Sequence, residues 1–260
     1  MKRSTQIPYA SMVGWLLTLA MTCYAPAAPA GPGTQALQQL AGEWSGTVMV
    51  KDRPVAVNLK LSGTESGADG TEFHYGVPRS CGLNAEYSGE GEGKQFFSFT
   101  TSNGGVCDQL IGGFLAARLG GDGTLTFDAT SNDGQTSTSG TLRRPTENTI
   151  GGQLTGQWSG QVMAGGRPIR LEVSVLKGSI GDDGAQLRYG APRSCQLSAE
   201  YEGIWNGQAA FGIKSATGGF CDRLTTGLIV MSAPSGGTLG FNITFPDGAP
   251  GDNGTLQKSP

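Results

Sequence analysis

The chain has 260 residues, with 18 Lys or Arg against 21 Asp or Glu, which gives a formal net charge of −3. This balance excludes the strongly basic surface typical of nucleic-acid-binding proteins, and a hydrophobic content of 37% excludes a wholly disordered chain. The 44 glycines follow no three-residue period, which excludes collagen and indicates many tight turns.

The first 30 residues have the features of an export signal. Lys2 and Arg3 precede an apolar run too short to span a bilayer, and Ala-Pro-Ala occurs twice within residues 25–30, as a signal peptidase requires. We therefore expect a signal peptide at 1–30, a periplasmic or secreted protein, and no transmembrane span. Lipid attachment at Cys23 is the alternative, but the three preceding residues fit a lipobox poorly.

The rest of the chain is a tandem repeat. Residues 40–145 align with 154–259 at a constant offset of 114 without an insertion, and 41 of the 106 pairs are identical. This predicts a β domain at 40–145 and a second at 154–260, joined by a linker at 146–153 and preceded by an extension at 31–39. The net charge is −4 in the first copy and 0 in the second, so the surfaces have diverged.

Four cysteines remain after residues 1–30, two in each copy. An even number in an exported protein indicates disulfides. Duplication favours pairing within each copy, Cys81 with Cys107 and Cys195 with Cys221, which closes loops of 26 residues. Each such bond stabilises its domain by roughly 3 kcal/mol.

Apolar residues alternate with polar ones at 55–61 and at 169–175, which is typical of half-buried strands. No comparable helical period appears beyond the signal peptide. We predict an all-β protein with two tandem antiparallel eight-stranded barrel-like domains, or two β-sandwiches as the alternative. The expected strands of the first copy, each repeated 114 residues later, are 43–50, 55–61, 71–76, 83–88, 95–101, 113–119, 123–129 and 139–144.

A Gly-x-Trp motif opens the first predicted strand of each copy, at Gly42 to Trp44 and at Gly156 to Trp158. This motif resembles that of the calycins, which include lipocalins, avidins and a family of bacterial metalloprotease inhibitors. The resemblance implies barrels in which a basic residue of the last strand lies over the tryptophan. Arg144 and Lys258 occupy the corresponding positions.

The sequence offers little for catalysis. His74 is the only histidine and its repeat counterpart is Arg188, so no histidine-based triad or zinc site is shared by the two copies. Single carboxylates and serines occur without a positioned base; an acidic partner for the glutamates would have to come from the disulfide loops. We therefore expect no enzyme activity, no cofactor and no metal; the residues considered are Ser80, Ser194, Glu86, Glu200, Asp108 and Asp222.

The segment Tyr-Gly-x-Pro-Arg-Ser-Cys occurs in both copies and supplies four candidate binding residues, Tyr75, Arg79, Tyr189 and Arg193. One interpretation is structural, with each arginine paired to the aspartate that follows the second cysteine of its copy. The other is functional, with a disulfide-braced loop presenting a rigid guanidinium to a ligand or to a protein pocket.

Trp205 is the fifth candidate binding residue, because its counterpart is Gly91 and because it begins a predicted hairpin turn with Asn206 and Gly207. It suits either external binding or packing between the copies. We expect an exported non-catalytic binding protein that recognises a protein, glycan or small ligand through its braced loops, with the second copy carrying the specialised site. The alternative is an inhibitor of a secreted hydrolase or protease, and a more distant one is a glycan-active hydrolase.

Peptide mapping under non-reducing conditions tests the covalent prediction. We expect two disulfide-linked peptide pairs, one from each copy, and no reactive thiol in the mature protein. A peptide joining Cys81 or Cys107 to the second copy would contradict both the pairing and the division into repeats.

Overall fold

The computed structural model describes residues 32–62, 70–147 and 149–259. The expected signal peptide, with Cys23, and Asn148 of the expected linker lie outside the described residues. Residues 31–260 form one compact unit, so the expected domain boundaries within it stay predictions.

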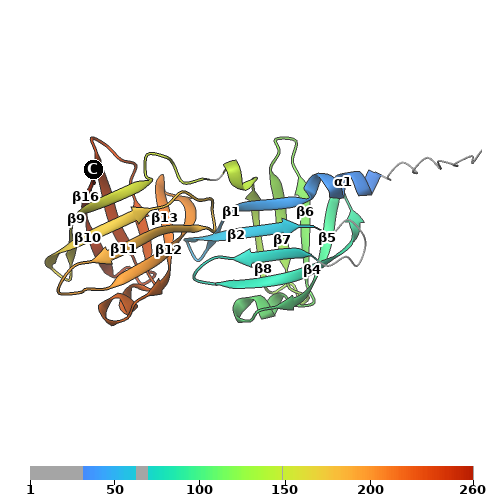
Figure 1. Ribbon diagram of the computed structural model, residues 1–260. Coiled ribbons are helices and arrows are strands. Elements are labelled where there is room, and N and C mark those ends of the chain that lie inside the picture. Colours follow the sequence, from blue (N-terminus) through green and yellow to red (C-terminus); the bar gives the residue numbers. More distant parts are fainter. Residues whose placement is uncertain (1–31, 63–69, 148, 260) are drawn as a thin grey trace, which may run out of the picture. The chain divides into compact units, whose positions relative to one another are not determined.

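The first half of the chain folds into an eight-stranded antiparallel sheet in which each strand pairs with the next in sequence (Figure 1). Its strands are β1 Gly42–Val50, β2 Arg53–Leu61, β3 Thr71–Tyr75, β4 Cys81–Gly91, β5 Lys94–Ser102, β6 Phe114–Leu119, β7 Leu125–Thr130 and β8 Ser137–Leu142. A bridge between Ser45 and Arg143 brings the two ends of the sheet together, so the barrel is nearly closed.

The second half repeats this arrangement as a fully closed barrel. Its strands are β9 Gly156–Ala164, β10 Arg167–Val175, β11 Asp183–Tyr189, β12 Gln196–Trp205, β13 Gln208–Ala216, β14 Leu228–Met231, β15 Thr238–Thr244 and β16 Pro250–Lys258. A ladder from Asn253 with Met163 to Lys258 with Trp158 closes it. The all-β prediction is confirmed, and of its two forms the barrel is the right one.

Small residues let the first and last strands of each barrel approach closely. A Cβ atom on Gly46 would lie 2.7 Å from the carbonyl oxygen of Thr141, and one on Gly160 would lie 2.5 Å from that of Thr255. Because such distances are shorter than van der Waals contact, a larger residue at either position would force the strands apart.

The barrel interiors are filled by side chains. In the first barrel the Phe73 ring lies 4.9 Å from that of Tyr75 and 5.5 Å from that of Phe127, between centroids. In the second, Tyr201 and Phe211 pack at 5.4 Å. Packed cores of this kind are usual for small barrels, and they direct attention to loops and outer surfaces as binding sites.

One disulfide braces each barrel, Cys81–Cys107 in the first and Cys195–Cys221 in the second, as predicted. The two bonds indicate an oxidising compartment. No helix within the described ranges is both long and apolar enough to cross a membrane.

Sequence patterns missed the helix α1, Pro32–Leu40, because residues 31–39 were expected only as an N-terminal extension and no helical period was found there. Nine residues are too few for a convincing period, although Pro32 is a favourable first helical residue. Leu37 and Leu40 are buried in the first core beside Trp44, and the Trp44 indole Nε1 donates to the Leu40 carbonyl at 2.8 Å. The helix therefore covers the end of the barrel where the first strand begins.

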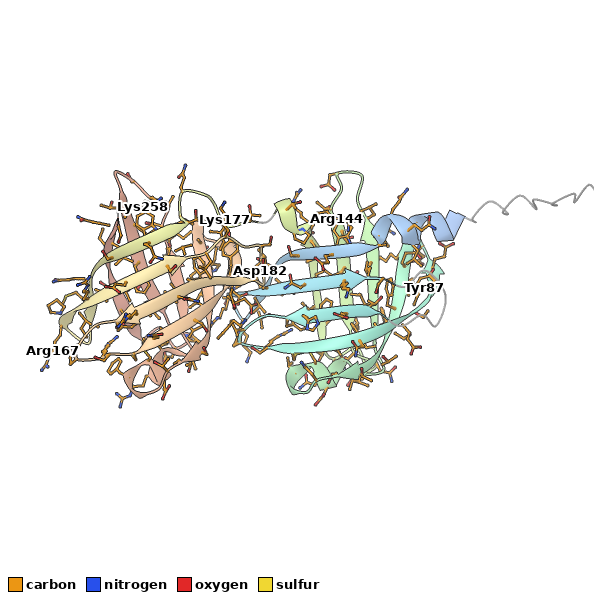
Figure 2. The ribbon with its side chains drawn as sticks, in the orientation of Figure 1. Tyr87, Arg144, Arg167, Lys177, Asp182 and Lys258 are labelled. Atoms are coloured by element: carbon orange, nitrogen blue, oxygen red, sulfur yellow. A yellow bond between two sulfur atoms is a disulfide. The ribbon has the colours of Figure 1, made fainter. Side chains whose placement is uncertain are left out.

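The basic residues implied by the calycin resemblance lie over their tryptophans (Figure 2 labels both). The Arg144 guanidinium is 3.7 Å from the Trp44 ring centroid and donates to the carbonyls of Gln39 and Ala41 at 3.1 and 3.0 Å. The Lys258 ammonium is farther from the Trp158 ring, at 5.4 Å. We call the contact of this basic side chain with its tryptophan the tryptophan clasp. The clasp is stronger in the first barrel than in the second.

Contacts also join the two barrels. Arg53, in the first, donates to the carbonyls of Thr226 and Gly227 in the second at 2.6 and 2.9 Å. Ala56 belongs to the core cluster of the second barrel and is fully buried, although the alternation in its strand predicted a solvent-facing position. The Glu202 carboxylate accepts a hydrogen bond from the Ala56 amide, which explains the difference.

Removing the two clasps should have unequal effects. We expect Arg144→Ala to lower the free energy of unfolding by about 1–3 kcal/mol, because charged hydrogen bonds and a cation–π contact are lost together. The matched variant Lys258→Ala should cost less than about 1 kcal/mol. Urea unfolding of both variants measures this, and equal losses would contradict the assignment of the stronger clasp to Arg144.

Candidate functional site

Strand direction decides which loops meet. Because consecutive strands are antiparallel, the turns after β1, β3, β5 and β7 lie at one end of the first barrel, opposite the end that begins with Gly42 and is covered by α1. The turns after β9, β11, β13 and β15 do the same in the second barrel. We call this the loop end, and it contains four of the five candidate binding residues.

The loop after β3 and the loop after β11 have the same construction. Each has a cis bond before its proline and a serine with positive φ, 43° at Ser80 and 47° at Ser194. Each is followed by the cysteine that is bonded to a short 3-10 helix, η1 Gly105–Leu110 or η3 Gly219–Leu224. The disulfide therefore anchors the backbone two residues after the arginine in each loop.

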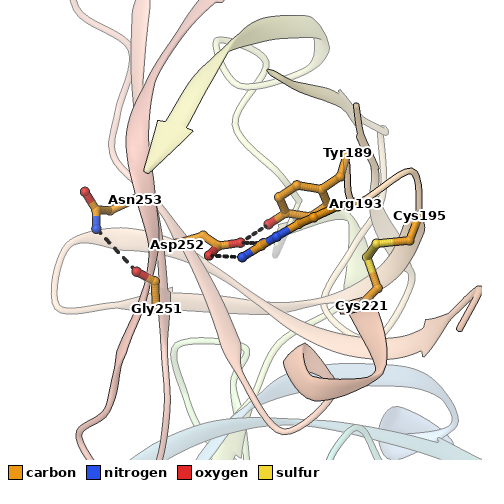
Figure 3. A network of polar contacts seen from close by, with 7 residues as sticks. All are labelled: Tyr189, Arg193, Cys195, Cys221, Gly251, Asp252 and Asn253. Carbon is orange, nitrogen blue, oxygen red and sulfur yellow. Dashed lines mark hydrogen bonds and ion pairs between the residues drawn. A yellow bond between two sulfur atoms is a disulfide. The ribbon is translucent and has the colours of Figure 1, made fainter. Parts of the chain in front are cut away.

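In the second barrel two side chains, with three donor groups between them, converge on one carboxylate (Figure 3). Arg193 uses both terminal nitrogens to contact the two oxygens of Asp252, a residue of β16. The Tyr189 hydroxyl donates to Asp252 Oδ2 at 2.8 Å. Only 5% of the side-chain surface of either ion-pair partner is exposed, so this is a buried, bidentate ion pair with a third donor.

The surroundings keep the tyrosine in its donor form. Burial, and after it the charge of Asp252, raise the pKa of Tyr189 above its ordinary range, so its hydroxyl retains the proton that Asp252 accepts. Phe220 of η3 covers the other side of the arginine, with its ring centroid 3.7 Å from the Arg193 guanidinium carbon. Arg193 thus makes its ion pair and its aromatic contact within its own barrel.

The structural interpretation of the arginines named the wrong partners. Arg193 pairs with Asp252 and not with Asp222, and in the first barrel Asp108 accepts a hydrogen bond from Ser102. A disulfide brings two backbones together, but it does not determine where the side chains one or two residues away point. Asp252 was missed because its repeat counterpart is Thr138, so it is not part of the shared pattern.

The first barrel has the same arginine and tyrosine in a different setting. Arg79 lies over the Tyr75 ring, 4.6 Å from its centroid, and donates to the Thr138 hydroxyl at 3.3 Å. Among the described residues no carboxylate lies within ion-pair distance of Arg79. Val106 stands where Phe220 covers Arg193, so the aromatic cover is absent as well.

The Tyr75 hydroxyl is buried and makes no hydrogen bond of normal geometry with any described residue. Thr138 and Arg79 lie close enough to oppose the rise in the pKa of Tyr75, but burial is the larger effect and the pKa is raised. A protonated phenol with an unused donor therefore points into the region beside Arg79, in the position that lets Tyr189 reach Asp252 in the other barrel.

Trp205 ends β12 and pairs with Gln208 across the predicted hairpin turn. Its side chain is half-buried against Ala210, Leu228 and Val230 on the outside of its own barrel. It also lines a hollow of about 240 Å³ with residues 51–53 of the first barrel. These contacts favour packing between the barrels, and an additional role in external binding stays a prediction.

The glutamates considered for catalysis lie elsewhere. Glu200 is opposite Asp183 in the β11–β12 ladder and is buried, with 7% of its surface exposed, and Lys214 binds Asp183 at 2.8 Å. Burial raises the pKa of Glu200 to about 7. Glu202, which is fully buried and bonded to the Ala56 amide, has a pKa raised well above its ordinary value by burial and then by Glu200.

A hollow on the second barrel lies on its outer face. It has a volume of about 460 Å³ and is lined mainly by polar side chains, among them Gln157, Glu172, Gln186, Arg188, Gln196 and Ser198. Its lining contains no aromatic ring on which a sugar could stack. No group of three or more metal-ligating side chains occurs in the part of the chain that the structure describes.

Comparisons with known proteins give no further identification. The chain matches no protein-family model, no curated protein and no solved structure.

The buried ion pair should be essential to the second barrel. We expect Asp252→Ala to lower the free energy of unfolding by about 3–5 kcal/mol, because it leaves the Arg193 charge buried without its partner. The matched change Thr138→Ala in the first barrel should cost about 1 kcal/mol or less. Denaturant unfolding distinguishes the two, and a small loss at Asp252 would contradict a buried pair.

Glu200 should make stability depend on pH. Its pKa is about 7 in the folded chain and lies near its ordinary value of 4.5 after unfolding, so the folded state binds more protons between these values. The free energy of unfolding should therefore fall as pH rises from about 4.5 to 7 and then level off.

Substitution of Glu200 isolates this effect. We expect Glu200→Gln to be more stable relative to wild type at pH 8 than at pH 4.5, by about 1–3 kcal/mol. Glu86→Gln, at the equivalent strand position, controls for the loss of a carboxyl group. Thermal unfolding across this pH range is the measurement, and parallel wild-type and Glu200→Gln profiles would disprove the burial of this carboxylate.

Proposed function

We propose that the protein is an exported, non-catalytic binding protein of calycin-like architecture that recognises its partner at the loop end of the first barrel. The observation that carries the proposal is the difference between two loop ends built on the same backbone. In the second barrel Asp252 pairs with the arginine and Phe220 covers it. In the first barrel the arginine donates to Thr138, and Val106 holds the position equivalent to Phe220.

Three further observations support a binding role at this end. The aromatic rings of the first barrel pack closely in its interior, which leaves the loops and outer surface for recognition. The disulfide and the adjoining loop fix the backbone of the arginine, so little conformational freedom is lost on binding. Tyr75 adds a buried donor beside the guanidinium.

The structure changes which copy we favour. The sequence suggested the second copy, because of Trp205 and its different charge. However, the Arg193 side chain is 5% exposed and held by Asp252, and Trp205 lies against its own barrel and beside the first. Arg79 is therefore the better candidate for an anchor.

Inhibition of a secreted hydrolase is the second candidate. It is favoured by the tryptophan clasp, because Arg144 over Trp44 reproduces the geometry implied by a resemblance that includes protease inhibitors. An inhibitor would use the same braced loop, so the two proposals share their key residue and differ in whether the partner is an enzyme whose turnover falls on binding.

Capture of a partner followed by substitution tests the proposal. The mature protein is immobilised, periplasmic or extracellular extract is passed over it, and the affinity of the purified partner is measured for wild type and variants. We expect Arg79→Ala to weaken binding at least tenfold, as for an interface anchor.

Arg118→Ala is the matched control, because Arg118 contacts the carbonyls of Glu92 and Gly93 in the β4–β5 turn, at the opposite end of the same barrel. It should change affinity less than about twofold, the range usual for residues outside the anchor. Equal affinities for Arg79→Ala and wild type would place recognition elsewhere. Loss of turnover by a captured enzyme would select the inhibitor alternative.

A further inference from the structure

We propose that Arg79, Tyr75 and Thr138 of the first barrel form a binding site for a carboxylate group supplied by a ligand. The inference deepens the proposed function, on which its biological role rests, by naming the chemical group that the loop end recognises.

The second barrel shows how such a group is held on this backbone. Asp252 receives both terminal nitrogens of Arg193 and the Tyr189 hydroxyl, so three donors meet one planar anion with two oxygens. The arginine and the tyrosine are identical in the two copies, and their loops share the cis proline, the positive-φ serine and the disulfide. Asp252 is thus an internal model for the ligand of the first barrel.

In the first barrel the donors are kept and their acceptor is lost. Thr138 holds the position equivalent to Asp252. Its hydroxyl accepts one hydrogen bond from Arg79, at 3.3 Å, whereas the Asp252 carboxylate offers two charged oxygens. The Tyr75 hydroxyl is buried and makes no hydrogen bond of normal geometry with a described residue, although Thr138 and Arg79 lie near it. A buried donor in this condition is destabilising unless something accepts from it. One carboxylate would accept from the tyrosine and the arginine together.

A second substitution gives access from outside. Phe220 covers Arg193 at 3.7 Å, but the corresponding residue beside Arg79 is Val106, whose side chain has no ring to place over the guanidinium. Arg79 is only half-buried, whereas 5% of the Arg193 side chain is exposed. The ligand takes the position of the missing aspartate and approaches through the side that the phenylalanine covers in the other barrel.

The geometry favours a carboxylate over a tetrahedral anion. Two parallel contacts from a planar guanidinium match the two oxygens of a carboxylate, and the single tyrosine donor binds one of those oxygens from the side. The shared group has two sources, a free small organic acid or the carboxyl terminus of a polypeptide, and the experiment separates them.

Acetate is the first probe, titrated into the mature protein at constant ionic strength while nitrogen-correlated NMR follows the Arg79 side chain and the Thr138 amide. We expect saturable shifts with millimolar affinity in wild type. Arg79→Gln and Thr138→Asp should each weaken binding at least tenfold, the second because it supplies an internal carboxylate. Asp252→Thr should add a second set of saturable shifts in the loop after β11.

Two further probes identify the source and the shape. N-acetyl-triglycine with a free carboxylate binding more tightly than acetate would indicate a polypeptide terminus, and equal affinities would indicate a small acid; the amidated peptide should not bind. Equal binding of acetate to wild type and Thr138→Asp, binding of the amide, or phosphate binding ten times more tightly than acetate would each overturn the proposal. If Asp252→Thr does not fold, the two variants of the first barrel decide.

The outcomes remain separable from those of the proposed function. Loss of the captured partner in Arg79→Ala without acetate binding would reject the carboxylate site and keep the binding role. If acetate binding depends on Arg79 but Arg79→Ala does not weaken binding of the captured partner, the carboxylate site is kept and the proposed recognition of that partner at the loop end is rejected.

Discussion

Alternation of strand direction is the constraint on which the loop end depends. In a barrel whose strands follow one another around the wall, every second turn must lie at the same end. The turns after β3 and β5 thereby become neighbours although 26 residues separate their cysteines, and the disulfide fixes them. The arginine and the two hydroxyl groups around it come from β3, the turn after β3, and β8, so no single segment contains the site.

The two barrels share one framework but surround the loop arginine differently. In the second barrel an aspartate on the last strand neutralises the arginine, and a phenylalanine covers it. That arrangement makes the loop end part of the core. In the first barrel both changes are absent, and the result is a charged and partly exposed group on a rigid support. The clasp at the opposite end is stronger in the first barrel, where Arg144 and α1 hold Trp44.

Much of the framework was predictable from the sequence, because it is encoded in short patterns. Alternation at 55–61 predicted a strand, the repeat gave the cysteine pairing, and the Gly-x-Trp motif led to Arg144. The helix α1 escaped because nine residues carry too weak a period. Asp183 and Gly184 form a dipeptide that favours hairpin turns, yet they begin β11 beside an irregularity in its pairing with β12.

The candidate site was predictable only in part. Arg79, Tyr75, Arg193 and Tyr189 stand out because they recur, and the structure places each pair together. Asp252 and Thr138 determine how the two sites differ, and a search for shared residues discards them for that reason. Positions at which one repeat gains a charge near the end of a strand were the available signal. Their partners still could not be named, because side-chain direction depends on the shear of the closed barrel.

The two barrels are closed along unequal seams, and this has a mechanical consequence. Six residue pairs join β16 to β9, whereas the bridge between Ser45 and Arg143 joins the ends of the first sheet. The bond between Cys81 and Cys107 runs from β4 to η1, on another part of the wall, so it does not span this seam. The Cys81–Cys107 bond therefore holds the loops of the first barrel, whereas its seam between β1 and β8 depends on non-covalent contacts, among them those of Arg144 with Ala41 and Trp44.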